Sequence, residues 1–237
     1  GKIICRTKVR AGSSIILKNI RNWMRTLSIQ KATKYNLGFG TASERTWVQK
    51  AIAKQYAEKV IAKAKKDGTI IYVDGSIHDM HSEERIKAQQ RGETGESIER
   101  EKHGGYGILL PLKNKDHVYN GRVQTNDAQL AEITGITKAL DIIEEIQQEE
   151  GITQKTYSII CDCKNAVNYS TGTYITPREY AMPIQKIKRK RANLIRKEID
   201  IKIKWIPGHS GERGNEIVDG LAKYAARSWD NSTYGHS

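Results

Sequence analysis

The feature that most constrains the fold is the alternation, after residue 68, of short apolar runs with amphipathic helical segments. β-branched and aromatic runs predict strands at 69–76, 104–112, 116–125, 156–163 and 200–208. Helical spacing of apolar residues predicts helices at 128–150, 164–172, 176–199 and 212–228. Three successive strands followed by helix, strand, helices, strand and helix predict an α/β fold with a mixed five-stranded sheet flanked by helices.

The chain divides into two parts of different charge. Residues 1–66 contain 16 lysines and arginines against two acids, whereas residues 67–237 contain 24 against 25. We therefore expect a basic helical extension at 1–67, a domain at 68–228 and a tail at 229–237. Helical patterns at 14–29 and 44–66 predict two helices in the extension, the second buried through Val48, Ile52, Tyr56 and Val60.

Net charge and composition indicate which kinds of partner and cellular location to expect. A net charge of +13 favours a polyanion, although a solvated basic surface on 1–66 is the alternative. The sequence has no apolar run long enough for a membrane span and no signal peptide, so we expect no membrane contact. Three cysteines give no disulfide framework and indicate a reducing intracellular location, nucleus or cytoplasm. No heptad run calls for a second copy, so we expect a monomer.

One segment stands out because it has almost nothing to bury. Residues 77–103 are polar and charged, without apolar periodicity, and they contain Gly92 and Gly95. This composition predicts a long exposed insertion. It begins directly after the run YVDGS, which we expect to end its strand in a turn.

Four acids occupy apolar surroundings in which a lone carboxylate is costly to desolvate. Asp74 and Asp162 follow strands, Glu132 lies in the first turns of a helix whose candidate N-cap is Asp127, and Asp219 lies inside the last helix. Taken singly, Asp74 could serve a turn, Glu132 the helix dipole, Asp162 a helix cap and Asp219 a salt bridge with a lysine. Together, carboxylates without paired Cys or His ligands suit Mg²⁺, with Mn²⁺ as the alternative. Two such ions suit phosphodiester displacement.

Five motifs then carry a resemblance to a known family. YVDGS, GGYG, LAEITGITKAL, CDCKNAV and WIPGHSGERGNEIVDGLAK, in this order, resemble the type 1 ribonuclease H domain over about residues 68–228. The resemblance implies a hydrolase that binds RNA–DNA hybrids and cleaves their RNA strand. Asp74, Glu132, Asp162 and Asp219 match the family's metal-binding acids. His209, in a glycine-bounded loop, matches its mobile histidine; the alternative is a surface histidine.

The resemblance also implies substrate contacts. Gly75, Ser76, Gln129 and Glu132 fit positions that contact the 2′-hydroxyl groups of RNA. Asn165 is a further candidate, or simply the start of a short helix. Lys188, Arg189 and Arg191 lie where some members contact the DNA strand, and a solvated or import-signal-like surface is the alternative reading.

The biological setting has three readings. The last motif and a basic helix before YVDGS resemble the ribonuclease H region of non-LTR retrotransposon polyproteins, which implies a reverse transcriptase in the same polyprotein. A stand-alone cellular enzyme that clears hybrids is the alternative. A degenerate domain that binds hybrid without cutting is the third, and the presence of the four acids and His209 argues against it.

Overall fold

The computed structural model describes residues 42–79, 86–87, 89–92, 102–112, 115–149 and 153–228. The expected helix at 14–29 and the tail at 229–237 lie outside this part of the chain. The strands are β1 (Thr69–Asp79), β2 (Lys102–Pro111), β3 (Asp116–Val123), β4 (Thr156–Cys161) and β5 (Asp200–Trp205). They form one sheet in the order β3-β2-β1-β4-β5, in which β1 pairs antiparallel with β2 and parallel with β4. The predicted mixed five-stranded sheet is confirmed.

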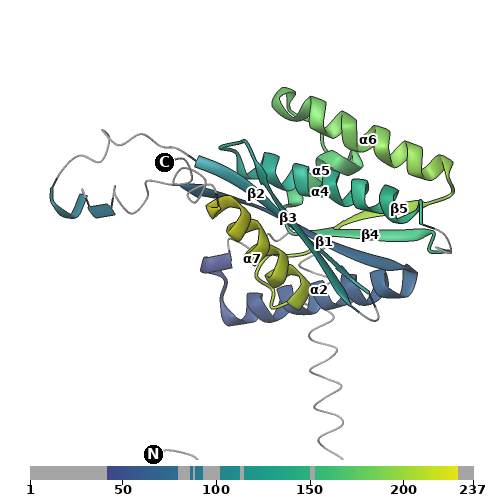
Figure 1. Cartoon of the computed structure of the whole chain (residues 1–237). Coiled ribbons are helices and arrows are strands. Elements are labelled where there is room, and N and C mark those ends of the chain that lie inside the picture. The colour runs from purple at the N-terminus through teal and green to yellow at the C-terminus, as the bar shows by residue number, and fades with distance from the viewer. Residues whose placement is uncertain are drawn as a thin grey trace, which may run out of the picture.

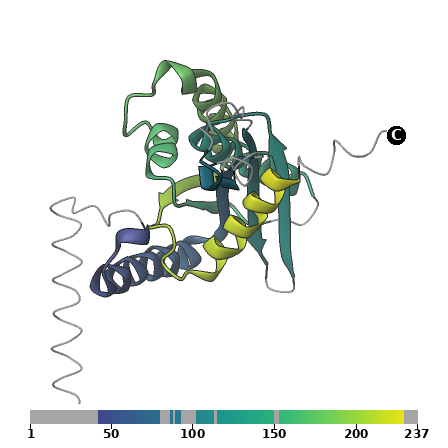
Figure 2. The ribbon, with the colours of Figure 1, turned by 90° about the vertical axis from the view of Figure 1, so that its left-hand side faces the viewer.

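Helices cover both faces of this sheet. They are η1 (Ala42–Glu44), α2 (Trp47–Asp67), α4 (Ala128–Ile146), α5 (Lys164–Thr171), η3 (Arg178–Tyr180), α6 (Ala181–Arg196) and α7 (Arg213–Arg227). In Figure 1, α4, α5 and α6 lie above the sheet, whereas α2 and α7 lie below it. The same two layers are visible from the side in Figure 2. None of the helices in the described ranges has the length and apolar character needed to span a bilayer.

Side chains alternate between the two faces of the sheet along each strand, so they contribute to two hydrophobic cores, one on each face. On β1, Ile71 and Val73 join the core beneath α4, α5 and α6, whereas Ile70 and Tyr72 join the core beneath α2 and α7. Both faces of the central strands are therefore buried, which explains why TIIYV reads as an uninterrupted apolar run.

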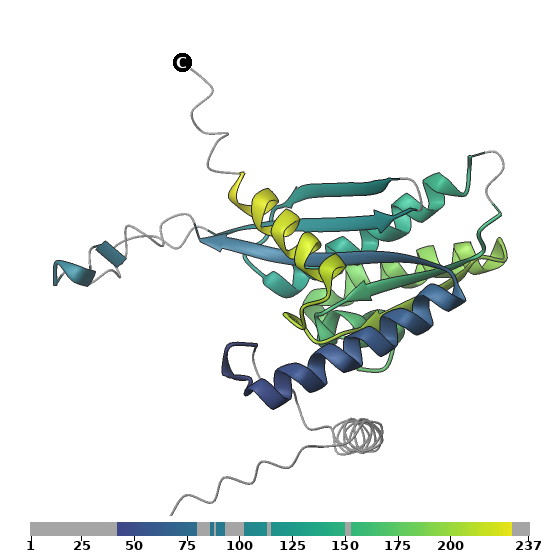
Figure 3. The ribbon, with the colours of Figure 1, turned by 90° about the horizontal axis from the view of Figure 1, so that it is seen from below.

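Helix α2 is packed against the sheet, and the predicted stripe is only partly buried. Val60 packs against the core, Ile52 and Tyr56 are half-buried, and Val48 is 43% exposed. The fully buried residues are Ala53, Ala57, Ile61 and Ala64. Most of them are alanines, which let a helix approach the sheet more closely than large side chains do. Figure 3 shows α2 running along the sheet beside α7. Part of the basic extension thus shares a core with the domain.

The strands beside residues 77–103 are longer than expected. β1 continues through the DGS sequence, and Ile77 pairs with Gly104, His78 with His103 and Asp79 with Lys102. Asp74 therefore lies within a strand, so the expected turn after YVDGS is wrong. Part of the segment expected to be exposed belongs to the sheet.

The GGYG sequence on β2 is explained by the approach of α7. A Cβ atom added to Gly105 would lie 2.3 Å from the main-chain nitrogen of Ala226, and one added to Gly107 would lie 2.4 Å from the carbonyl oxygen of Val218. The two glycines thus let the backbone of α7 lie directly on β2. Ala222 and Ala225 make this contact, whereas Tyr224 is 67% exposed.

Candidate active site

The register of the sheet brings Asp74 and Asp162 together. β1 and β4 are parallel neighbours, and Val73 pairs with Cys161 in the last pair of their ladder. The residue that follows each of these two is an aspartate, so Asp74 and Asp162 lie side by side. The side chain of Asp74 is buried and that of Asp162 is half-buried. The sequence placed both acids at strand boundaries; their adjacency comes from the strand order.

Glu132 reaches the same place from α4. The Asp127 side chain caps this helix by accepting hydrogen bonds from the main-chain nitrogens of Gln129 at 2.8 Å and Leu130 at 3.4 Å, which confirms the predicted N-cap. A Cβ atom on Gly75 would lie 2.2 Å from the main-chain nitrogen of Glu132. Gly75 therefore lets the first turns of α4 lie against β1, and the Glu132 side chain, 7% exposed, points toward Asp74.

Three carboxylates consequently form one compact group. Asp74, Glu132 and Asp162 each place an oxygen within 4.8 Å of the others. Burial, followed by the charge of Asp162, raises the pKa of Asp74 to about 8. Burial and then Asp74 hold the pKa of Glu132 well above its usual range, and burial raises that of Asp162. Ionising these acids together is therefore costly in the folded protein, and a bound cation would offset that cost.

A hard divalent cation fits this group. All three donors are carboxylate oxygens, which Mg²⁺, Mn²⁺ and Ca²⁺ prefer. The thiol of Cys161 lies 3.5 Å from Glu132 Oε2. Its pKa is raised by burial and by Glu132, so it stays a neutral thiol rather than a thiolate ligand for a soft metal.

These pKa shifts predict how the metal-free protein responds to pH. An acid whose folded pKa is raised binds its proton more tightly in the folded state, so stability falls as pH rises from the unfolded to the folded value. For Asp74 this window runs from 3.8 to about 8. We expect Asp74→Asn to stabilise the metal-free protein at pH 8 by on the order of 2 kcal/mol, the usual cost of an uncompensated buried polar group. Thermal unfolding in EDTA measures this, and equal stability at pH 5 and pH 8 in the wild type would contradict it.

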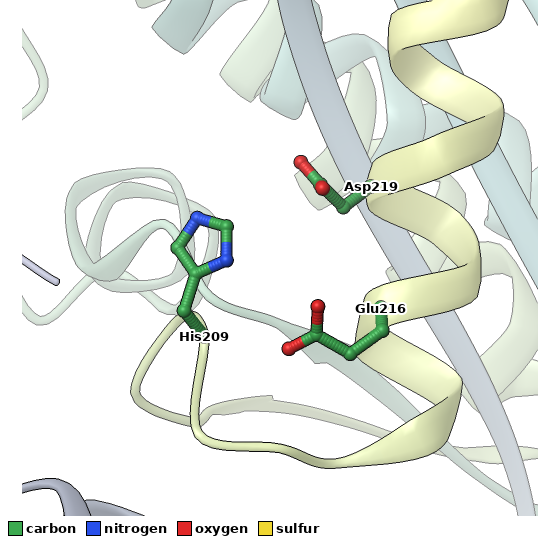
Figure 4. A group of neighbouring side chains, drawn as sticks. All are labelled: His209, Glu216 and Asp219. Carbon is green, nitrogen blue, oxygen red and sulfur yellow. The ribbon is translucent and has the colours of Figure 1, made fainter. Parts of the chain in front are cut away.

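Asp219 belongs to a second group, adjoining the first. His209, Glu216 and Asp219 have ligand atoms within 4.8 Å of one another. Figure 4 shows that the carboxylates of Glu216 and Asp219 extend from α7 toward the imidazole of His209. The charge of Asp219 raises the pKa of Asp74 and of Asp162. Asp219 also pairs with Lys223 at 2.7 Å, so the salt bridge considered from the sequence is present as well. The four predicted acids thus form two neighbouring groups.

The loop that carries His209 is closely packed at one end and exposed at the other. A Cβ atom on Gly208 would lie 2.6 Å from Asp162 Oδ2, so this main chain rests on the carboxylate. His209 is exposed and has a φ of 48°, and Gly211 has a φ of 75°. Left-handed conformations are unfavourable for side chains other than glycine, so the loop holds His209 in a strained position facing α7.

Sequence reasoning missed two residues of this site. Asn215 is 2% exposed, and its Nδ2 donates to Asp162 Oδ2 at 2.9 Å. Glu216 is the acid next to His209 and Asp219. Asn215 lies four residues before Asp219, on the same side of α7, and this spacing was the available signal. The indole of Trp205 also donates to the main-chain oxygen of Asp162 at 2.8 Å.

The predicted substrate residues fall into two sets. Gly75, Ser76 and Gln129 are half-buried beside the carboxylates, and Asn165 is exposed at the start of α5. Lys188 and Arg189 are exposed on α6. Arg191 is half-buried, and its guanidinium donates to the carbonyl oxygens of Ser170 and Ile201 at 3.3 and 3.2 Å and so joins α5 to β5.

A group of tyrosines, also missed, lies between α5 and α6. Tyr169 stacks on Tyr180, with ring centroids 6.0 Å apart, and meets the exposed Tyr174 edge-on. The hydroxyl of Tyr180 donates to Asp127 Oδ2 at 2.6 Å, and Asp127 is the cap of α4. The tyrosines are thereby tied to the helix that carries Glu132.

A comparison with models of known protein families shows which family this chain belongs to. The RNase H family model matches residues 94–227, more than half of the chain. The chain belongs to the RNase H family. It is accordingly an enzyme of the ribonuclease H class. The match begins after Asp74. The position of Asp74 in the site therefore comes from the pairing of β1 with β4.

Curated relatives agree with this assignment. A ribonuclease H of Ruthia magnifica subsp. Calyptogena magnifica is 26% identical over 124 residues, which are 52% of this chain and 84% of that protein. The ribonuclease H of Orientia tsutsugamushi (strain Boryong) is 28% identical over 120 residues, covering 50% and 70%. Neither alignment extends over the whole of this chain.

Two solved structures are also similar to the chain. LC11-RNase H1, isolated from compost, has a TM-score of 0.49 at 14% identity, covering 69% of this chain and 98% of its own. The foamy viral protease-reverse transcriptase in complex with RNA/DNA hybrid has a TM-score of 0.49 at 17% identity, covering 68% and 20%.

Proposed function

We propose that this RNase H domain hydrolyses the RNA strand of RNA–DNA hybrids with two bound Mg²⁺ ions. The observation that carries the proposal is the carboxylate trio Asp74, Glu132 and Asp162 next to the group His209, Glu216 and Asp219. Two adjoining sets of ligands, in which every donor except the imidazole of His209 is a carboxylate, suit a pair of hard cations, and Mn²⁺ would fit the same donors. The resemblance of the motifs and the names of the curated relatives support the substrate.

The residues of the chain have distinct tasks in this scheme. Bound Mg²⁺ would supply Lewis acidity to the phosphate and lower the pKa of water. Asp74, Glu132 and Asp162 would hold one ion, and Asp219 would share the second with the trio. Asn215 orients Asp162 through its hydrogen bond. The exposed imidazole of His209 can accept a proton from water or give one to the leaving 3′ oxygen.

The surroundings of the trio fit an RNA strand. A protein distinguishes RNA from DNA by contacts to the 2′-hydroxyl. The main chain of Gly75 lies against that of Glu132, Ser76 follows Gly75 on β1, and Gln129 lies about one turn before Glu132 on α4. Lys188 and Arg189, exposed on α6, would contact phosphates of the other strand. The tyrosines between these regions offer ring faces for sugars, which the sequence analysis did not foresee.

A panel of labelled duplexes tests the substrate. Equal amounts of RNA–DNA hybrid, duplex RNA, duplex DNA and single-stranded RNA of one sequence are incubated with the enzyme and Mg²⁺. We expect cleavage of the hybrid's RNA strand alone. Binding of the hybrid without cleavage would instead favour a non-catalytic hybrid-binding domain, and cleavage of duplex RNA at the same rate would contradict the proposed specificity.

His209→Ala tests the proton-transfer role. General acid–base groups contribute about a hundredfold or more to rate, so we expect multiple-turnover cleavage to fall by about that factor without vanishing. Hybrid affinity should change little, because the imidazole is one exposed group among many contacts. Multiple-turnover and single-turnover rates are measured in parallel, with exposed His117→Ala as the control. An unchanged rate would make His209 a bystander.

We further propose that the domain is part of a retroelement polyprotein and works with a reverse transcriptase. The basic segment that precedes β1 supports this setting. A stand-alone enzyme that clears hybrids inside the cell fits the bacterial ribonucleases H among the relatives, and free Cys161 and Cys163 suit a reducing compartment in either case. The coding sequence around residues 1–237 decides between them: an in-frame reverse transcriptase supports the retroelement, and its absence supports the stand-alone enzyme.

A further inference from the structure

We propose that Arg45, in the basic segment before the first strand, is a positioning residue that holds the His209 loop against Asp162. The proposal deepens the function given above and rests on it. It assigns to residues 42–67 a part in the catalytic rate as well as any part in binding nucleic acid.

The contact spans most of the chain. Nη1 of Arg45 donates a hydrogen bond to the carbonyl oxygen of Gly208 at 2.5 Å, across a sequence separation of 163 residues. Gly208 is the residue whose main chain rests on Asp162 Oδ2. Burial lowers the pKa of Arg45 and raises that of Asp162, and the attraction between the two charges opposes both shifts, so the guanidinium lies close to the carboxylate. Arg45 thus touches the loop on the side where it meets the carboxylate.

Arg45 is itself fixed by the helix that follows. Thr46 caps α2 in a capping box with Gln49, so the chain direction at Arg45 is set. Ala57, Ile61 and Ala64 anchor α2 in the core it shares with β1 and α7. Farther along, the ring of Tyr56 lies 5.8 Å from that of Trp205, whose indole bonds to Asp162.

The loop needs such support. His209 and Gly211 both have positive φ angles, and the residues between β5 and α7 contain no regular secondary structure. Arg45, held at the start of a packed helix, donates a charged hydrogen bond to Gly208 and so restricts where the imidazole of His209 can lie. Because misplacing a catalytic group by about 1 Å can cost on the order of a hundredfold in rate, this restriction affects catalysis directly.

The test compares Arg45→Ala and Arg45→Lys with Lys50→Ala, which removes the same charge from an exposed position on α2. Single-turnover cleavage at saturating hybrid and hybrid affinity are measured separately. We expect Arg45→Ala to lower the cleavage rate about tenfold, a modest share of what misplacement can cost. Affinity should fall no more than in Lys50→Ala, and Arg45→Lys, which retains a donor, should restore part of the rate.

A second measurement separates positioning from folding and from failure of the proposed function. Hydrogen exchange of the amides in residues 208–212 should quicken in Arg45→Ala and not in Lys50→Ala, whether or not the protein cleaves hybrid. Leu194→Ala, in the core on the other face of the sheet, lowers stability without touching α2 or Gly208. If Leu194→Ala slows cleavage as much as Arg45→Ala at equal loss of melting temperature, or if Arg45→Ala leaves rate and exchange unchanged, the positioning role is wrong.

Discussion

Asp162→Asn is expected to lower the rate of hybrid cleavage by about a thousandfold or more, since a catalytic metal ion supplies several kcal/mol of transition-state stabilisation. Asp162 is in contact with residues from several elements of the site. It lies beside Asp74 in the sheet, accepts a hydrogen bond from Asn215 and supports the main chain of Gly208. An asparagine keeps the size and can keep the hydrogen bond, but it loses the charge that would bind a cation.

The same variant should remain folded. Removing one of three crowded carboxylates relieves repulsion, so the metal-free melting temperature should stay equal or rise, and hybrid binding should persist. Glu149→Gln, at an exposed position just after α4, removes one negative charge at a distance and should cleave as the wild type does. Cleavage by Asp162→Asn at the rate of Glu149→Gln would show that the metal assignment is wrong.

Gly107→Ala is expected to produce a large loss of stability, about 3 kcal/mol. The added methyl would lie 2.4 Å from the carbonyl oxygen of Val218 and 2.8 Å from the main-chain nitrogen of Ala222. Both are backbone atoms of α7, so the helix must move away from β2. Because Asn215, Glu216 and Asp219 are on α7, cleavage should fall as well. Chemical denaturation and the hybrid assay measure the two effects.

The same helix offers a matched control. Gly220 lies within α7, and a Cβ atom added there would meet nothing within 4 Å. Gly220→Ala should stabilise the protein by about 0.5–1 kcal/mol, because alanine loses less conformational entropy in a helix. Destabilisation by both substitutions would mean that α7 tolerates no added methyl, and a neutral Gly107→Ala would contradict the close contact of α7 with β2.

The parts of the fold that sequence predicts well depend on local pattern. The strands read as β-branched runs because both faces of the central strands are buried, and α4 shows a strong apolar period with its cap at Asp127. Asp74, Glu132 and Asp162 were found because each interrupts an apolar context. Their assembly into one group then follows from the strand order β2-β1-β4.

The parts that sequence did not predict depend on contacts between distant segments. Three of the four buried residues of α2 are alanines, whose apolar signal is weak beside Val48 and Tyr56. In the sequence, Arg191 looks like one more exposed basic residue of α6. Its guanidinium instead donates to main-chain oxygens of α5 and β5. The bonds from Arg45 to Gly208 and from Asn215 to Asp162 join residues 163 and 53 positions apart, which no local pattern can reveal.

The most direct test of the central claim is the nature of the cut ends in an RNA–DNA hybrid whose RNA strand carries a 5′ label. With Mg²⁺ present, metal-assisted attack by water predicts RNA fragments that end in a 3′-hydroxyl, and EDTA should stop their formation. Fragments that end in a 2′,3′-cyclic phosphate and form equally well in EDTA would mean attack by the RNA's own 2′-hydroxyl without a metal, and would contradict the role assigned to Asp74, Glu132 and Asp162.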